Sequence, residues 1–506
     1  MAKSIMVQGT MSNAGKSLVT AGLCRVFYQD GYKVAPFKSQ NMALNSFITR
    51  TGAEMGRAQV VQAEAAGAEP SVLMNPILLK PTSDKGSQVI VNGEAVGTMS
   101  AAEYFSYKTS LIPAIMSAYG ELEANNEIIV LEGAGSPAEI NLRGQDIVNM
   151  GMAKMAKSPV LLVADIDRGG VFASIYGTLL LLAEDERKMV KGIIINKFRG
   201  DINILQPGLQ MIEEKVGIPV VGVLPMLTVD IEDEDSLSVR LEERTEVKAV
   251  DIAVIKLPRM SNYTDFNIFE LILGVSLRYV SSARELKTPD MIVLPGTKNT
   301  ISDLLWLRQN GLEAEILKRA DAGTVIFGVC GGFQMLGQRL SDPYGIEEGG
   351  EVSGIGLLPT ETVFAEKKRT IQVEGRFGTV KGILGKLSGQ SFRGYEIHSG
   401  VTNVCKDDGL TFTKPMHREE PFSEEGAQFV KEQKAVYGSY VHGIFDTPGI
   451  ADTIVEALLA KKGLKTEDLQ TISFEQYKQE QYDLLAEQVR KNMDVGKIYE
   501  ILKAGI

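Results

Sequence analysis

The sequence predicts an α/β protein with two doubly wound domains, each built around a largely parallel sheet. Short runs rich in Val, Ile and Leu alternate with segments of helical apolar spacing along most of the chain. A chain of 506 residues is too long for one hydrophobic core, so two or three domains are expected. Two strand–turn–helix segments, one near each end, carry reactive side chains, which indicates one functional centre in each half.

Apolar strands are expected at intervals through the first half of the chain. These runs have the β-branched character of buried parallel strands and cover 3–8, 33–37, 127–131, 160–164, 192–196 and 220–224. The first run precedes a helix expected over 18–27, because apolar residues there recur at helical spacing. The first half is therefore expected to form one doubly wound sheet with helices on its faces.

An acidic stretch at 230–236 interrupts this pattern and continues into charged residues as far as Lys248. We expect a first domain over 1–230, an acidic linker over 231–249, a second domain over 250–450 and a helical C-terminal extension over 451–506. The second domain opens with a strand at 250–255. Its later strands end near Pro295, Cys330 and His442.

Composition excludes several classes of protein. A net charge of −11 argues against a nucleic-acid partner. The cysteines, Cys24, Cys330 and Cys405, have no disulfide or metal spacing, which fits a reducing compartment. The sequence has no signal peptide and no apolar run long enough to span a bilayer, so a cytoplasmic location without a membrane partner is expected. A homo-oligomer is compatible with the sequence, which does not fix the oligomeric state.

The turn after the first strand is a phosphate-binding loop in its required strand–loop–helix setting. It reads Gly9-Thr-Met-Ser-Asn-Ala-Gly-Lys-Ser17, with five rather than four residues between the two glycines. Lys16 is expected to reach the β- and γ-phosphates of ATP, and the Ser17 hydroxyl to bind Mg²⁺. The N–H groups of the loop and helix start are expected to cradle phosphate oxygens; these residues are Thr10, Ser12, Asn13, Ala14 and Gly15.

The turn near the other end places Cys330 between a β-branched strand and a helix expected over 332–340. Glycines at 328 and 332 permit a tight, strained turn that exposes the central side chain at the start of the helix. A helix N-terminus there favours the thiolate form of Cys330. A buried structural cysteine is the plainer reading, but strand, G-x-C-x-G and helix together favour a nucleophile.

A thiolate nucleophile needs a base, and the chain has three histidines. His442 ends an apolar strand at a His-Gly turn, where strand ends of α/β folds converge on the catalytic edge of the sheet. His398 also ends a strand and is the second candidate. His417 lies among Lys, Pro, Arg and Glu, which is typical of an exposed loop. We therefore expect His442 to act with Cys330.

The whole chain resembles the cobyric acid synthase family, the glutamine-dependent amidating enzymes of cobalamin biosynthesis. The motifs that carry the resemblance lie in both halves, at Gln8–Ser17, Ala35–Asn45, Glu54–Ala66, Met74–Pro81, Leu131–Leu142, Ala164–Gly170, Leu294–Thr300, Gly328–Leu336 and Tyr440–Phe445. The first half is also similar to dethiobiotin synthetase, a carboxylate-activating P-loop enzyme. The second half resembles the flavodoxin-like class I glutamine amidotransferase domain.

The resemblance implies ATP- and glutamine-dependent amidation of four peripheral carboxylates of adenosylcobyrinic acid a,c-diamide, giving adenosylcobyric acid. The partners it implies are the corrinoid, ATP and glutamine, with Mg²⁺ as cofactor. Cobyrinic acid a,c-diamide synthase, which amidates two other carboxylates of the ring, is the nearest alternative; the segment Ser39–Asn45 favours the four-carboxylate enzyme. A partition-type ATPase would not explain Cys330 and His442, and a binding protein with a decayed glutaminase half would not keep them intact beside Lys16 and Glu132.

The resemblance also implies roles in the first half. Glu132 matches the second Mg²⁺ ligand, since a cation bound through phosphates needs few protein carboxylates. Lys38 resembles the second lysine of the dethiobiotin synthetase family, which stabilises the acyl phosphate. Asn196, with Lys197, is similar to that family's adenine site. Asp165 and Arg168 are candidates for binding metal or ring carboxylates.

In the second half, Cys330 matches the family's nucleophile and His442 its base. The expected oxyanion donors are the N–H of Gly331 and that of Gly296 or Thr297. Class I amidotransferases usually carry His-x-Glu, whereas position 444 here is Ile. The group that orients His442 therefore stays open, with Asp446 as one candidate.

Overall fold

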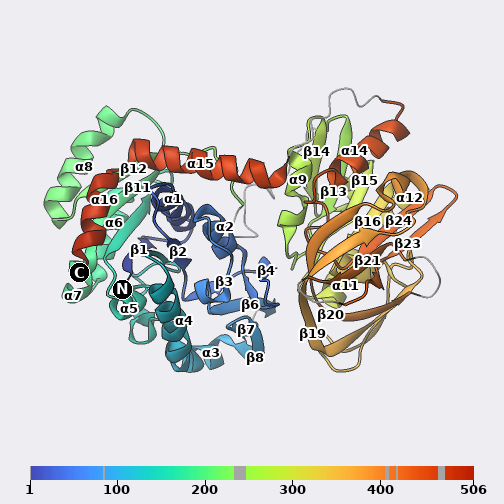
Figure 1. Ribbon diagram of the computed structural model, residues 1–506, viewed down its shortest axis with the longest axis horizontal. Helices are drawn as coiled ribbons and strands as arrows, with labels where there is room; N and C mark the ends of the chain where they lie inside the picture. Colours follow the sequence, from blue (N-terminus) through green and yellow to red (C-terminus); the bar gives the residue numbers. More distant parts are fainter. Residues whose placement is uncertain (1, 84–85, 233–246, 405–408, 417–419, 465–472) are drawn as a thin grey trace. The chain divides into compact units, whose positions relative to one another are not determined.

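The chain forms two compact units, which we call unit 1 and unit 2. The computed structural model describes residues 2–83, 86–232, 247–404, 409–416, 420–464 and 473–506 (Figure 1). Unit 1 comprises Met1–Ala43, Glu54–Glu234 and Tyr477–Ile506, and unit 2 comprises Leu44–Ala53 and Asp235–Gln476. The segment Leu44–Ala53 thus belongs to unit 2 although its neighbours in sequence belong to unit 1. Most of the expected linker, 233–246, lies outside the described residues.

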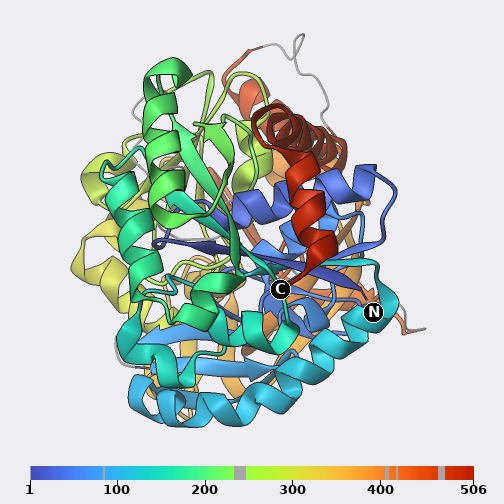
Figure 2. The same cartoon turned by 90° about the vertical axis from the view of Figure 1, so that its left-hand side faces the viewer.

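The main sheet of unit 1 is parallel, with the order β12-β11-β10-β1-β9-β2. Its strands are β1 (Lys3–Gly9), β2 (Val34–Phe37), β9 (Ile128–Glu132), β10 (Val160–Asp165), β11 (Val190–Phe198) and β12 (Val220–Pro225). These strands fall where the apolar runs predicted them, because a strand covered on both faces by helices must be apolar on both faces. Figure 2 shows the helices on either side of this sheet.

A smaller sheet of unit 1, which the sequence pattern did not predict, has the order β3-β6-β7-β8. Its strands are β3 (Gln40–Met42), β6 (Ile77–Ser83), β7 (Gly86–Val91) and β8 (Glu94–Ser100). β6, β7 and β8 form an antiparallel meander, whereas β3 pairs with β6 in parallel. The strand β5 (Glu54–Gly56) precedes the helix α2.

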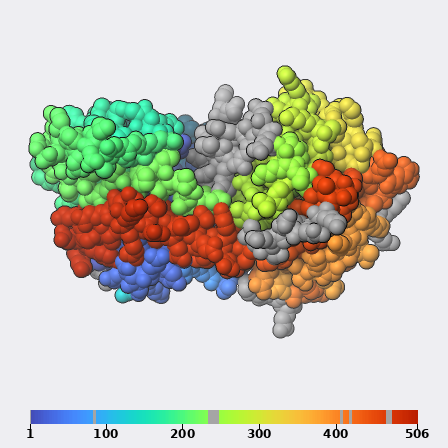
Figure 3. Space-filling model, turned by 90° about the horizontal axis from the view of Figure 1, so that it is seen from above, coloured from blue at the N-terminus to red at the C-terminus, as the bar shows by residue number. Residues whose placement is uncertain are grey.

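The helices of unit 1 are α1 (Lys16–Gln29), α2 (Arg57–Ala65), α3 (Ala101–Tyr107), α4 (Ile112–Asn125), α5 (Met150–Ala156), α6 (Val171–Leu181), α7 (Glu184–Met189), α8 (Ile202–Val216), α15 (Phe474–Asn492) and α16 (Val495–Ala504). Several of them pack on the main sheet, α3 packs on β8 of the smaller sheet, and the end of the chain, from Tyr477 in α15 onward, also belongs to this unit. Residues of α15 and α16 join the core around α1. A Cβ on Gly22 would lie 2.7 Å from Val489 Cγ2, so this glycine lets α1 and α15 approach closely. Figure 3 shows the C-terminal segment in red on the surface of unit 1.

The expected extension 451–506 is therefore divided between the units: α14 (Ile450–Lys461) belongs to unit 2, and the chain from Tyr477 belongs to unit 1. Residues 465–472 lie outside the described part of the chain.

The central sheet of unit 2 has the order β14-β13-β15-β16-β24-β23. Its strands are β13 (Val250–Ile255), β14 (Val275–Val280), β15 (Met291–Leu294), β16 (Val325–Val329), β23 (Ala427–Lys431) and β24 (Lys434–Ser439). Only the β23–β24 pair in this described sheet is antiparallel. Helices pack on this sheet, namely η5 (Tyr263–Phe266), α9 (Asn267–Glu270), α10 (Ala283–Leu286), α11 (Thr300–Gln309), α12 (Leu312–Asp321), α13 (Gly331–Leu336) and α14.

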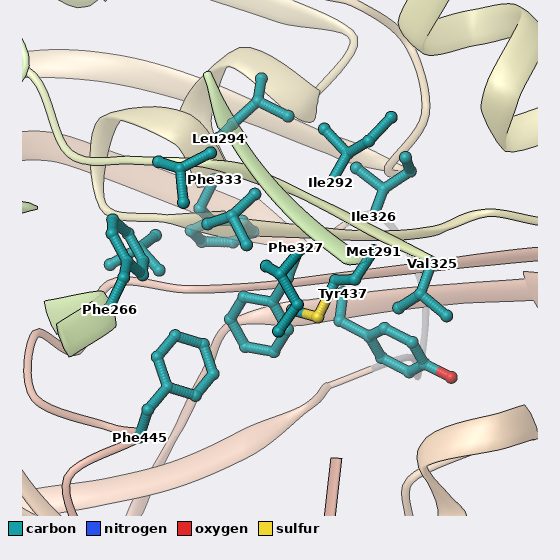
Figure 4. Packing of buried hydrophobic residues seen from close by; sticks show 14 of the residues in the cluster. Phe266, Met291, Ile292, Leu294, Val325, Ile326, Phe327, Phe333, Tyr437 and Phe445 are labelled. Atoms are coloured by element: carbon teal, nitrogen blue, oxygen red, sulfur yellow. The ribbon is translucent and has the colours of Figure 1, made fainter. Parts of the chain in front are cut away.

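An aromatic cluster joins three segments of unit 2 beneath the sheet edge. Phe445 packs with its ring centroid 5.1 Å from that of Phe327 in β16 and 5.2 Å from that of Phe269 in α9. Phe266, at the end of η5, completes the group, as Figure 4 shows. Each of these side chains is buried, and full burial of a Phe contributes roughly 2–3 kcal/mol. The cluster therefore holds the segments before Cys330, after His442 and around Asp265 together.

A second sheet of unit 2 has the order β18-β17-β19-β21-β22, with β20 paired to β19. Its strands are β17 (Arg339–Asp342), β18 (Gly350–Ser353), β19 (Thr360–Phe377), β20 (Ser391–Val404), β21 (Thr411–Pro415) and β22 (Ser423–Glu425), and β4 (Ser46–Ile48) also belongs to unit 2. The prediction of a helix over 332–340 is wrong at its C-terminal end, because α13 ends at Leu336. A Cβ on Gly337 would lie 2.7 Å from Thr360 Oγ1, and the chain extends there into β17, which pairs with β19.

Within the ranges that the structure describes, none of the helices is both long enough and apolar enough to cross a membrane.

Candidate active sites

The phosphate loop of unit 1 is held open by left-handed backbone at two positions, with φ of 59° at Asn13 and 96° at Gly15. α1 begins at Lys16 and has no acidic residue of its own in its first turn, and a helix N-terminus of this kind favours anions. Asn196 Nδ2 donates to the carbonyl of Ala14 at 2.9 Å. A Cβ on Gly15 would lie 2.0 Å from that Nδ2. Asn196, which lies near the end of β11, therefore stabilises the loop through this hydrogen bond.

Other predicted nucleotide residues surround the same loop. The N–H of Thr10 donates to Val163 O at 2.9 Å, and Ser12 is exposed. Lys16 Nζ donates to the carbonyls of Met11 and Gly135 at 3.2 and 3.1 Å. The lysine thus crosses the loop toward the segment after β9, and this places its ammonium over the concave side of the loop.

Three side chains, those of Ser17, Lys38 and Gln62, donate to the buried carboxylate of Glu132 beside the loop. We call Lys16, Ser17, Lys38 and Glu132 the phosphate centre. Glu132 Oε1 accepts hydrogen bonds from Ser17 Oγ at 2.8 Å and Lys38 Nζ at 3.0 Å. Glu132 Oε2 accepts from Gln62 Nε2 at 2.5 Å. Parallel pairing of β1 and β9 brings Glu132 to the same sheet edge as the loop. Sequence reasoning did not single out Gln62, although the motif Glu54–Ala66 contains it.

A hydroxyl and a carboxylate at this separation suit Mg²⁺, a hard cation that takes few protein oxygens when phosphates supply the rest. Among the described residues, no group of three or more His, Cys, Asp or Glu side chains could hold a metal without such help. The donor set at Ser17 and Glu132 therefore fits a metal that arrives with a nucleotide.

The buried Asp165 pairs with the partly exposed Lys197 next to the loop. Lys197 Nζ donates to Asp165 Oδ2 at 2.8 Å and to the carbonyl of Asn13 at 2.7 Å. Arg168 is largely exposed, and its Nε lies 3.9 Å from the same Asp165 oxygen. Lys197, held by Asp165, therefore stabilises the conformation of the loop through its bond to Asn13.

In unit 2, Cys330 occupies a strained turn between β16 and α13. Its φ of 51° and ψ of −109° are rare for a residue with a side chain. A Cβ on Gly332 would lie 2.0 Å from Leu294 O, and one on Gly328 would lie 2.7 Å from the N of Phe333. The N–H of Cys330 donates to Ser439 O at 2.8 Å, which ties the turn to β24. The glycines are therefore required by close backbone packing, as expected of a nucleophile elbow.

His442 is fully enclosed and lies against both Cys330 and an acidic partner. Its Nδ1 is 2.6 Å from Asp265 Oδ2, and the Cys330 sulfur lies near enough to interact with it electrostatically. Burial disfavours the charged imidazolium, but the Asp265 carboxylate and the Cys330 sulfur outweigh it and raise the pKa of His442 to about 10. We call Cys330, His442 and Asp265 the thiol centre. The carboxylate that contacts His442 is therefore Asp265, not Asp446.

The predicted oxyanion donors border this centre. A Cβ on Gly331 would lie 3.2 Å from the N of Thr297, and one on Gly296 would lie 2.8 Å from His442 Cε1. The turn at Thr297 is held by its hydroxyl, which donates to Asp303 Oδ2 and to Arg259 O. Gly331 therefore lies close to the backbone nitrogen of Thr297, and Gly296 leaves room for the imidazole.

The second candidate base, His398, has other partners. Its Nδ1 is 2.7 Å from Gly400 O, its Nε2 is 3.2 Å from Glu396 Oε2, and its ring stacks on Tyr440 with centroids 3.6 Å apart. Both ring nitrogens thus contact protein oxygens away from the thiol. His417 lies outside the described residues.

The sequence pattern did not point to Asp265, because this residue lies in the helical turn η5 beyond the end of β13 and has no recognisable motif around it. The signal that could have found it is position, since loops after parallel strands meet at the catalytic edge. Asn262 precedes η5 in left-handed conformation, with φ of 54°, and its carbonyl accepts the Asp265 N–H at 3.1 Å.

Comparisons with known proteins identify two domains in the chain. Residues 5–237 match the family model of the CobQ/CobB/MinD/ParA nucleotide binding domain, and residues 251–449 match that of the CobB/CobQ-like glutamine amidotransferase domain. The cobyric acid synthase of Lachnoclostridium phytofermentans is 58% identical over 100% of both chains. Those of Ruminiclostridium cellulolyticum and Alkaliphilus metalliredigens are 56% and 52% identical, covering 100% and 98% of this chain and 98% and 99% of theirs.

Proposed function

Because the chain belongs to the cobyric acid synthase family of glutamine-dependent ligases, we propose that it amidates four peripheral carboxylates of adenosylcobyrinic acid a,c-diamide to give adenosylcobyric acid. One observation carries the proposal: a phosphate centre around Glu132 and a thiol centre around Cys330 occur in one chain. The first suits carboxylate activation by ATP, and the second suits release of ammonia from glutamine.

The thiol centre accounts for glutamine hydrolysis. An imidazolium at His442 stabilises a thiolate at Cys330, which attacks the side-chain carbonyl of glutamine. The N–H groups of Gly331 and Thr297 stabilise the oxyanion of the tetrahedral intermediate. His442 gives its proton to the departing nitrogen as the carbon–nitrogen bond breaks, so ammonia leaves and a thioester remains. Water, deprotonated by His442, then attacks the thioester and releases glutamate and the thiolate.

The phosphate centre accounts for carboxylate activation. The loop N–H groups and Lys16 hold the triphosphate, while the corrinoid carboxylate attacks the γ-phosphorus and ADP leaves. Lys38 neutralises charge on the acyl phosphate that forms. Ser17 and Glu132 would hold Mg²⁺, which supplies positive charge to the phosphate oxygens. Ammonia attacks the activated carbonyl carbon, loses a proton to form the amide, and displaces phosphate.

Coupling the two reactions in one chain has a chemical reason. Ammonia in water at neutral pH is mostly ammonium, which has no lone pair for attack. Producing ammonia within the same molecule that forms the acyl phosphate raises its effective concentration for the second step.

Mass spectrometry of the corrinoid product tests this function. The full chain is incubated with the a,c-diamide, Mg²⁺, ATP and glutamine, and the conversions of carboxylate to amide are counted. Four conversions that require both ATP and a nitrogen source support the proposal. Absence of product from the diamide, with two conversions of cobyrinic acid instead, would assign the chain to the diamide synthase reaction. ATP hydrolysis without any amide would contradict both.

A further inference from the structure

A short segment from the first half of the sequence, Asn45–Phe47, lies within unit 2 against the loop that carries Asp265. Asn45 Oδ1 accepts the N–H of Asn262 at 2.8 Å. Asn262 Nδ2 in turn donates to the carbonyl of Ser46 at 2.8 Å. All three polar residues are at least nine-tenths buried, so these bonds are shielded from water. Asn262 is thereby held on both its backbone and its side chain by one neighbouring segment.

The same segment also contacts Tyr395, which flanks His442. Tyr395 Oη accepts a hydrogen bond from Asn262 Nδ2 at 2.7 Å and lies 3.3 Å from Ser46 O. The Phe47 ring meets the Tyr395 ring edge-on, with centroids 5.3 Å apart. Tyr395 exchanges two backbone hydrogen bonds with His442 and stacks on its imidazole at 5.4 Å. The segment therefore reaches the imidazole through Tyr395 and its acidic partner through Asn262.

We propose that Asn45–Phe47 is a positioning element of the thiol centre, acting through Asn262 and Tyr395 to fix the Asp265–His442 pair. The proposal rests on the glutaminase role of Cys330 and adds residues to it. Asn262 has the left-handed backbone that aims its carbonyl at the Asp265 N–H, and the bonds from Asn45 and Ser46 hold it there. Without them the carboxylate has a wider range of orientations relative to Nδ1 of His442, and the proton transfers lose alignment.

The consequence is that the glutaminase site is incomplete without residues from the half of the sequence that carries the phosphate loop. Asn45 follows Lys38 of the phosphate centre by seven positions. The chain passes from unit 1 to unit 2 after Ala43 and returns at Glu54.

Three substitutions in the full-length enzyme test the proposal. Asn45→Ala removes the acceptor for the Asn262 N–H, whereas Asn45→Asp keeps an acceptor oxygen at that place. Asn262→Gly removes the side-chain bonds while tolerating the positive φ. Thr51→Ala is the control, since Thr51 lies outside Asn45–Phe47 but within the same stretch of unit 2, Leu44–Ala53, and its Oγ1 bonds Thr49 Oγ1. Glutamate release and ammonia-dependent amidation are measured for each variant.

We expect kcat for glutamine hydrolysis to fall roughly tenfold in Asn45→Ala and Asn262→Gly, with KM for glutamine little changed. Asn45→Asp should recover most of the rate, Thr51→Ala should match the wild type, and ammonia-dependent amidation should persist in all. Normal kcat in both Asn45→Ala and Asn262→Gly would overturn the proposal, as would equal loss of glutamine- and ammonia-dependent activity. A wild-type enzyme that makes no amide would instead refute the proposed function.

Discussion

Asp265 Oδ2 lies 2.6 Å from Nδ1 of His442, although 177 residues separate them in the sequence. The other carboxylate oxygen, Oδ1, accepts the N–H of Gly443 at 3.1 Å. The carboxylate is thus fixed at two points, one on the imidazole and one on the backbone after it. Such a partner holds the histidine in one tautomer and orientation, the part that Glu plays where His-x-Glu is present.

Replacing Asp265 by Asn should lower glutaminase activity by roughly a hundredfold or more while sparing ammonia-dependent amidation. Burial alone would lower the pKa of His442, but the Asp265 carboxylate and the Cys330 sulfur together raise it to about 10. The alkaline limb of the glutaminase pH profile, where the imidazolium is lost, should therefore move to lower pH in Asp265→Asn. Glutamate release measured across the pH range checks this. Asp446→Asn is the matched comparison, and a larger loss there would reassign the orienting carboxylate.

Cys330→Ala should abolish glutamine-dependent amidation and leave amidation at high ammonia intact. Only the nucleophile is removed, and alanine needs no more room in the elbow than cysteine. The two nitrogen sources are compared in parallel by counting amides on the corrinoid. Undiminished use of glutamine by this variant would show that another group attacks the amide.

Lys16→Ala should abolish amidation with either nitrogen source, because the charge beside the β- and γ-phosphates is needed before any acyl phosphate forms. Glutamate release should continue at a basal rate, since Cys330 and His442 are untouched. Lys33→Ala, which alters an exposed lysine, serves as the control and should behave as the wild type. Near-normal ammonia-dependent synthesis in Lys16→Ala would mean that the loop does not serve the ligase reaction.

Glu425→Gln should change how stability depends on pH. Burial and the nearby Glu396 raise the pKa of Glu425 to about 7, above the ordinary 4.5 for a glutamate. A glutamate whose pKa is higher in the folded state than in the unfolded state binds its proton more tightly when the protein is folded. The free energy of unfolding of the wild type should therefore fall as pH rises from about 4.5 to about 7 and stay lower above that. Gln stays uncharged, so the variant should lose less stability over this window.

The fluorescence of Trp306, the chain's single tryptophan, reports this unfolding because it packs against the core of unit 2. Urea midpoints at acid and alkaline pH are compared for the variant and the wild type. An equal decline of both midpoints across the window would exclude Glu425 as the titrating group.

Phe445→Ala should destabilise unit 2 by about 3–5 kcal/mol, because it empties a buried site between Phe327 and Phe269. Glutaminase activity should fall as well, since Phe445 closely follows His442. Trp306 fluorescence during urea unfolding gives the change in stability. Tyr344→Ala, at a residue that is 61% exposed, is the control and should change the midpoint little. If the two substitutions changed the urea midpoint by similar amounts, the aromatic cluster would not be what supports the thiol centre.

The sequence by itself determined the features that depend on neighbours along the chain. The apolar runs predicted the strands of the main sheet of unit 1 and, in the central sheet of unit 2, β13, β15, β16 and β24 but not β14 or β23. A strand buried on both faces has an apolar pattern of its own. The loop before Lys16 and the turn at Cys330 were recognised because their glycines, strand and helix are contiguous. His442 followed from its place beyond a strand end, and the family match supports the two-domain reading.

The tertiary structure decided what depends on residues far apart in the sequence. Asp265 reaches His442 only because β13 and β24 end at the same edge of one sheet, and no local pattern records that edge. Asn45 likewise stands in the first half of the sequence and belongs to unit 2. The spacing of residues along the sequence therefore gives no sign of its contact with Asn262. Hydrogen bonds between side chains depend on distance in space. Sequence patterns, in contrast, reveal only the periodicity of residues within a single helix or strand. For that reason Cys330 and His442 could be proposed as nucleophile and base from the sequence, whereas their contacts with Asp265 and Asn45–Phe47 could not.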